Sequence, residues 1–264
     1  QPFRRTTSLV RGLDYYNITV TGAITTPTED DVFQACFGPD YANGNLTIDG
    51  NSATDPNCTG IRRNPATGNL FGELATTPGL PLFFSNQGRI FTDGIDLTLA
   101  YSTDLTADIG WSSNFGGNWT NSEEFQSTPA GVNRDCVGLY STNCGGVGSG
   151  ALNPEFTFNW RNTVTYDKFA VSLNWQYLSS MDAEIPASFQ EEFTSIPAFS
   201  YFDLSIQADV DPVVLTLGVQ NLFDKQPPIV GSNIGSTANN SGNTFPNVYD
   251  IRGRSYAATV QMSF

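Results

Sequence analysis

The sequence predicts an all-β fold, a transmembrane antiparallel β-barrel with eight strands in this chain of 264 residues. Two patterns lead to this prediction. Eight segments alternate apolar and polar side chains, and each is close to the length with which a tilted strand crosses an outer membrane. Short turns and long polar connections also alternate between these segments. No run approaches the roughly 20 apolar residues that a membrane helix needs, so a membrane crossing here would use strands.

The apolar residues of each segment are expected to share one face, because successive side chains of a strand point in opposite directions. The first four segments are Leu13 to Ile24, Arg89 to Ser102, Thr106 to Trp119 and Phe156 to Tyr166. Their expected membrane-facing residues are, in order, Tyr16, Ile18, Val20 and Ile24; Ile95, Leu97, Leu99 and Tyr101; Ile109, Trp111, Phe115 and Trp119; and Phe156, Phe158, Trp160, Val164 and Tyr166. The opposite faces are mainly short and polar.

The last four segments repeat the pattern over Lys168 to Ser180, Phe199 to Val210, Pro212 to Leu222 and Tyr249 to Phe264. Their expected membrane-facing residues are Phe169, Val171, Leu173, Trp175 and Tyr177; Phe202, Leu204, Ile206 and Val210; Val213, Leu215, Leu217 and Val219; and Tyr256, Ala258, Val260, Met262 and Phe264. A last strand that ends on an aromatic residue is typical of an outer-membrane barrel.

The connections predict an asymmetric molecule. Three are tight turns, at Thr103 to Leu105, at Asp167 and at Asp211-Pro212. Four are long, at Thr25 to Gly88, Thr120 to Glu155, Met181 to Ala198 and Phe223 to Val248. Short periplasmic turns on one rim and long extracellular loops on the other are typical of bacterial barrels. A soluble β-sandwich also alternates, but aromatic residues at the strand ends favour the membrane.

The composition excludes several function classes. A net charge of -14 argues against nucleic-acid binding, which needs a basic surface. The absence of histidine excludes Ser-His-Asp hydrolysis and His-ligated zinc within this chain. We therefore predict no catalytic residues, no cofactor and no metal site, and no enzymatic activity.

Four cysteines form two close pairs within the long polar connections, Cys36 with Cys58 and Cys136 with Cys144. CxxC spacing is absent, so metal binding is disfavoured and two disulfides in an oxidising compartment are expected.

Several aromatic residues lie in or near the long connections, where the exposure of apolar rings to water needs an explanation. They are Phe83, Phe84, Trp119, Phe125, Tyr140, Phe189 and Phe193. One interpretation is that they stack on a ligand, since aromatic faces offer rigid apolar area. The other is that they pack the loops together or lie in the interfacial aromatic belt.

The segment from Gly218 to Pro228 contains the most specific motif, Asn221-Leu222-Phe223-Asp224 followed by Pro227 and Pro228. Asn221 and Asp224 are expected to cap turning backbone groups, and the prolines to block further strand pairing. This motif resembles the NLFDxxPP signature of TonB-dependent receptors. Further matches are Gly12 to Ile18, Gly94 to Leu97, Asp203 and the run from Tyr249 to Tyr256 that contains Gly253 and Arg254.

The resemblance implies a 22-stranded outer-membrane barrel that imports a scarce solute, such as a ferric siderophore, an oligosaccharide or a cobalamin, without catalysis. An N-terminal plug domain closes such barrels and contacts TonB. This chain, residues 1 to 264, would match the last eight strands. We expect a second polypeptide to supply the plug and the remaining strands. By the same resemblance, Tyr256, Val260, Met262 and Phe264 would guide insertion by the barrel-assembly machinery, with the loops extracellular and the C-terminus periplasmic.

The alternative is a closed eight-stranded barrel that acts as an adhesin or a structural protein. The interior of so small a barrel must be filled with side chains. The inward residues expected here are mostly Ser, Thr, Gly, Asn and Gln, which suit the wall of a wide, wet lumen. The sequence therefore favours part of a larger barrel, and it does not identify the ligand.

Overall fold

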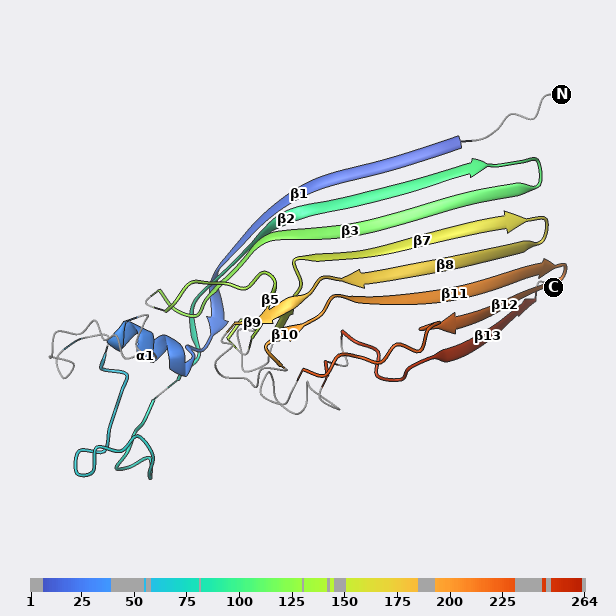
Figure 1. Ribbon diagram of the computed structural model, residues 1–264. Helices are drawn as coiled ribbons and strands as arrows, with labels where there is room; N and C mark the ends of the chain where they lie inside the picture. The colour runs from blue at the N-terminus through green and yellow to red at the C-terminus, as the bar shows by residue number, and fades with distance from the viewer. Residues whose placement is uncertain are drawn as a thin grey trace.

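The computed structural model describes residues 7–38, 55, 58–80, 82–129, 131–141, 143–144, 151–184, 193–230, 244–245 and 248–262. Eight long antiparallel strands form its main sheet, each pairing with the next along the chain (Figure 1). They are β1 (Thr7–Thr25), β2 (Ser85–Asp104), β3 (Ile109–Gln126), β7 (Phe156–Tyr166), β8 (Phe169–Leu178), β11 (Phe199–Val210), β12 (Val213–Gln220) and β13 (Ser255–Met262). All eight predicted strands are therefore present, in the predicted order. The short β4 (Arg134–Asp135) pairs with β3.

The three tight turns lie at one end of the sheet and the four long connections at the other (Figure 1). The turn between β2 and β3 comprises residues 105–108, slightly later than predicted, because Leu105 and Thr106 both donate to the Ile109 carbonyl. Between β7 and β8, Asp167 has a left-handed backbone (φ 48°), a conformation that Asp tolerates.

The long connections contain their own secondary structure. Helix α1 (Glu29–Phe37) follows β1. A second, four-stranded sheet in the order β10-β9-β5-β6 combines two connections, with β5 (Leu139–Ser141) and β6 (Ala151–Asn153) from one and β9 (Met181–Ala183) and β10 (Ser195–Ile196) from the other. Among the described residues, no helix is long and apolar enough to span a membrane.

The strand register assigns each side chain to a face, because residues opposite each other in an antiparallel pair point the same way. We call the face that carries Leu97, Phe158, Trp175, Leu204 and Leu217 the apolar face, and the other the polar face. Opposite pairs such as Phe115 with Trp160, Trp175 with Phe202 and Leu217 with Ala258 follow the predicted assignment from β2 to β13.

The predicted face is wrong for Tyr16, Ile18 and Val20 of β1. Leu13 lies opposite Leu97 and Tyr15 opposite Ile95, so these residues occupy the apolar face. Tyr16 lies opposite Gly94 on the polar face, and its hydroxyl accepts a hydrogen bond from Asn118 Nδ2 (3.1 Å). Both faces of β1 carry large apolar side chains, so alternation alone leaves the choice open. Only the pairing with β2 decides it.

Strand lengths divide the sheet into two parts. β1, β2 and β3 have 19, 20 and 18 residues, whereas β7 to β13 of the main sheet have 8 to 12. A β-bulge at Asp93 and Gly94 of β2 against β3 lies in the long part. β13 begins at Ser255, six residues later than predicted, so Tyr249 and its neighbours belong to the connection.

The sheet is open. Within the described residues, β1 pairs only with β2, and β13 pairs only with β12. Two edge strands therefore keep unpaired backbone groups, which a hydrocarbon environment does not tolerate.

Candidate functional site

The long connections pack together at one end of the sheet, and we call their described residues the loop assembly. Its core consists of nine buried side chains from three connections and the start of β11, namely Tyr140, Met181, Ala183, Ile196, Phe199, Tyr201, Val230, Phe245 and Tyr249. Tyr140 is 1% exposed and donates from its hydroxyl to the Phe193 carbonyl. Burial, with a contribution from the Asp182 carboxylate, raises the pKa of Tyr140 to about 12, so this donor stays protonated.

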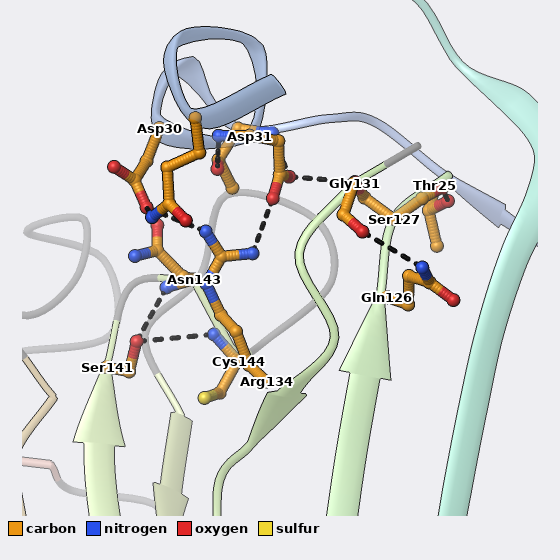
Figure 2. Close-up of polar contacts among 12 residues, drawn as sticks. Thr25, Asp30, Asp31, Gln126, Ser127, Gly131, Arg134, Ser141, Asn143 and Cys144 are labelled. Carbon is orange, nitrogen blue, oxygen red and sulfur yellow. Dashed lines mark hydrogen bonds and ion pairs between the residues drawn. The ribbon is translucent and has the colours of Figure 1, made fainter. Parts of the chain in front are cut away.

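One buried arginine joins three connections. Figure 2 shows the Arg134 guanidinium beside Asp30 and Asp31 of α1. Its Nη1 lies 2.5 Å from Asp31 Oδ1, its Nη2 lies 2.8 Å from Asp30 Oδ2, and its Nε lies 3.0 Å from Glu184 Oε1. The Arg134 side chain is only 5% exposed. Its planar array of donors suits several carboxylates at once, as a lysine ammonium would not.

The first turn of α1 holds Asp31 in place for this contact. The Thr28 side chain accepts from the Asp31 backbone N–H (3.1 Å), while the Asp31 carboxylate accepts from the Thr28 N–H (2.8 Å), which is a capping box. Ser127 also donates to Asp31 (2.7 Å), and Thr25 donates to the Ser127 carbonyl (Figure 2). Burial alone would raise the pKa of Asp31, but the hydrogen bonds from Thr28, Arg134 and Ser127 outweigh it and lower the pKa.

Both predicted disulfides are present and lie in the loop assembly. Cys36, in α1, is bonded to Cys58, and Cys136 is bonded to Cys144 close to Arg134. Glu184, the third carboxylate on Arg134, also accepts from the Ser141 hydroxyl and from Asn143 (3.0 Å). The ion pairs and the second disulfide thus stabilise the same part of the assembly.

The NLFD motif connects the end of β12 to β11 and to β13. The Asn221 backbone N–H donates to Asp203 Oδ1 (2.9 Å), and the Asn221 side chain exchanges two hydrogen bonds with the Lys225 backbone. Asp224 Oδ1 accepts from the Arg254 N–H (2.8 Å). Asn221 and Asp224 have left-handed backbones, which these two residue types adopt more readily than most. Phe223 packs edge-on against Phe202 on the apolar face.

A pocket of about 550 Å³ opens on the polar face beside this motif, within the size range of small-molecule sites. Its polar lining includes Gln176, Tyr201, Asp203, Gln220, Asn221 and Arg252. These residues come from β8, β11, the end of β12 and the connection that precedes β13. Within the part of the chain that the structure describes, no group of three or more metal-ligating side chains is found.

The described residues among the aromatic candidates do not form a single cluster. Tyr140 and Phe125 are buried, at 1% and 4% exposure, and Phe193 is half-buried beside Tyr140. Trp119 lies on the apolar face and donates from its indole to Glu155 (3.1 Å). Phe83 and Phe84 are largely exposed. Phe189 lies outside the described residues, as does Phe264, whereas Tyr256, Val260 and Met262 lie on the apolar face of β13.

Sequence reasoning missed the Arg134 cluster. Arg134 lies 103 residues from Asp31 and 50 from Glu184, and these residues match no local motif. The one readable signal was the spacing of Thr28 and Asp31 before an apolar segment, which is a capping pattern. Alternation predicts the polar face for Gln176, Tyr201, Asp203 and Gln220, but no local pattern predicts that they line one pocket.

The open antiparallel sheet, with one apolar face, aromatic residues along the strands and all long connections at one end, has the architecture of a fragment of a transmembrane β-barrel. The family model described as "TonB dependent receptor-like, beta-barrel" matches residues 8–222. The chain belongs to this family, whose members are outer-membrane transporters rather than enzymes. None of the curated proteins matches this chain in sequence.

Solved structures share the fold. A mutant of the ferric enterobactin receptor PfeA from Pseudomonas aeruginosa is similar with a TM-score of 0.53 and 14% identity, over 97% of this chain and 29% of the receptor chain. Another PfeA mutant, in complex with enterobactin, is similar with a TM-score of 0.52 and 15% identity over the same shares. The present chain thus spans less than a third of the length of these receptors.

Proposed function

We propose that this chain forms part of the barrel wall and the ligand-capturing loops of a TonB-dependent transporter that takes up a scarce solute across the outer membrane. The observation that carries the proposal is the position of the loop assembly, which gathers four long connections into one packed structure at a single end of an open sheet. The end of the sheet that carries the loop assembly then lies on the extracellular side, and β13 runs toward the periplasm. Ferric siderophores, oligosaccharides and cobalamins are the candidate solutes.

The proposal includes partners. Strands outside residues 1 to 264 pair with the open edges of β1 and β13, and a plug that contacts TonB occupies the lumen beside the polar face. The barrel-assembly machinery inserts the chain, guided by Tyr256, Val260, Met262 and Phe264. The matched share of the PfeA chains supports this arrangement, since most of their length has no counterpart here. The alternative, a closed eight-stranded barrel, would need β1 to pair with β13.

Among the aromatic candidates, Phe83 and Phe84 are best placed to contact a solute, since they are 74% and 65% exposed in the connection between β1 and β2. Phe193 and Phe189 are secondary candidates, whereas Trp119 lies on the apolar face and is not one. Phe125 and Tyr140 are buried, so we assign them to loop packing.

Uptake in matched hosts with and without TonB tests the proposal. The intact receptor that contains these residues is produced in a Gram-negative host that lacks its own receptors, and accumulation of labelled ferric siderophores, cobalamin and oligosaccharides is measured. We expect one solute to accumulate only in the host with TonB. Equal accumulation of every solute in both hosts, with the receptor folded in the outer membrane, would overturn the proposal.

A further inference from the structure

The polar pocket beside the NLFD motif has an arranged set of hydrogen-bonding groups. Asp203, on β11, accepts from Gln176 Nε2 (3.0 Å) and from the Asn221 backbone N–H (2.9 Å). Gln220 Oε1 accepts from the Ser255 hydroxyl (3.0 Å), which orients the Gln220 amide. A carboxylate and two amides, each fixed by a neighbour, therefore line one side of the pocket. Such groups donate to and accept from hydroxyls at little further entropic cost.

Two tyrosines of the loop core lie behind the polar groups of the same pocket. Tyr201 is 7% exposed, and its hydroxyl accepts from the Asp250 backbone N–H (2.8 Å). Tyr249 is 1% exposed, and within the described residues its buried hydroxyl has no hydrogen-bond partner. Burial raises the pKa of Tyr249 to about 12, so its hydroxyl remains a donor.

The charge at this end of the molecule opposes anions. Asp203 and Asp250 bring two negative charges to the pocket and Arg252 brings one positive charge, so the lining is negative by one. Arg252 is also engaged, because its Nε lies 3.2 Å from Asp250 Oδ1. In the loop assembly three carboxylates surround Arg134, and at the adjacent ends of β2 and β3 Arg89 pairs with Glu124. A trianionic ferric tris-catecholate would thus meet an unfavourable potential.

From this geometry and charge we infer that the pocket binds an uncharged, polyhydroxylated solute, namely the sugar rings of a neutral glycan. Sugar hydroxyls match the amides of Gln176 and Gln220 and the carboxylate of Asp203. This inference rests on the proposed function and names the class of solute. It separates the present chain from receptors whose ligand is a ferric catecholate.

Binding to the intact, detergent-purified receptor tests the inference, with an array of neutral and anionic glycans and with ferric enterobactin as the anionic probe. We expect neutral glycans to bind and ferric enterobactin not to bind. Gln176→Leu and Gln220→Leu should each weaken glycan binding about tenfold, since each removes hydrogen bonds from the pocket. Gln261→Leu is the matched control, because Gln261 lies on the polar face of β13 near the opposite end.

Heat-modifiable mobility shows that each variant folds. Binding of ferric enterobactin in preference to neutral glycans would overturn the inference, as would the absence of neutral glycan binding or glycan binding that neither pocket variant weakens. The proposed function fails separately. If the receptor takes up a ferric siderophore in a TonB-dependent way, the proposed function stands and the inference of a glycan ligand is rejected. If the pocket binds a glycan but no solute is taken up in a TonB-dependent way, the inference stands and the proposed function is rejected.

Discussion

The main sheet and the loop assembly bury apolar side chains to very different extents. Leu217 and Val260, on the apolar face of the sheet, are 50% and 61% exposed, whereas Met181 and Ile196 of the loop assembly are each 1% exposed. The sheet presents its apolar side chains to its surroundings, as a membrane wall does. The loop assembly has its own hydrophobic core, ion pairs and disulfides, as a water-exposed domain does. Different interactions therefore stabilise the two regions of the chain, and substitutions should affect the two regions separately.

The largest difference is expected at Arg134. Arg134→Met leaves Asp31 buried without its cation, and removing one partner of a buried ion pair costs about 3 to 5 kcal/mol. The stability of the loop assembly should fall by this amount, measured as faster proteolysis of the loops under native conditions, while the sheet keeps its heat-modifiable mobility. Arg89→Met is the control. Its pair with Glu124 is 38% and 27% exposed, so about 1 kcal/mol or less is expected. Similar losses in both variants would contradict the comparison.

The two methionines of the chain allow the same test for apolar packing. Met181→Ala opens a cavity in the loop core, which should cost about 2 to 5 kcal/mol in loop stability. Met262→Ala, at a side chain 52% exposed on the apolar face of β13, leaves no enclosed cavity and should change loop proteolysis little. If Met262→Ala loosened the loops as much as Met181→Ala, the two regions would not be independent.

The disulfides should stabilise the loop assembly and not the sheet. Replacing a disulfide by two serines typically costs about 2 to 4 kcal/mol, and a longer closed loop costs more. The Cys36 to Cys58 bond closes a separation of 22 residues and the Cys136 to Cys144 bond one of 8, so loss of the former should be larger by about 1 kcal/mol. Proteolysis of the paired serine variants measures this. Mass mapping that recovered four free thiols from fresh outer membrane would refute both bonds.

Acid should loosen the loop assembly by a smaller amount. The pKa of Asp31 lies below its ordinary value of 3.8 in the folded state, so the contribution is complete above about pH 4 and is lost as the pH falls through the lowered folded-state pKa. Loop proteolysis by an acid-stable protease should therefore rise between pH 4 and about pH 2, while the sheet stays folded. Asp31→Asn should abolish this acid-sensitive step. A step that persisted in Asp31→Asn would assign it to another group.

Alternation in the sequence predicts the eight long strands, their order and the faces of seven of them, because it is a local property of each segment and the turns constrain antiparallel neighbours. The sequence also indicated both disulfides and the turning role of Asn221 and Asp224. It misassigned the faces of β1, where Tyr16, Ile18 and Leu13 fit either face, since register depends on backbone pairing with β2. Only the tertiary structure decided that Arg134 meets Asp31 and Glu184, and that Gln176, Asp203 and Gln220 line one pocket. Such contacts join residues far apart in the chain, so no local pattern records them.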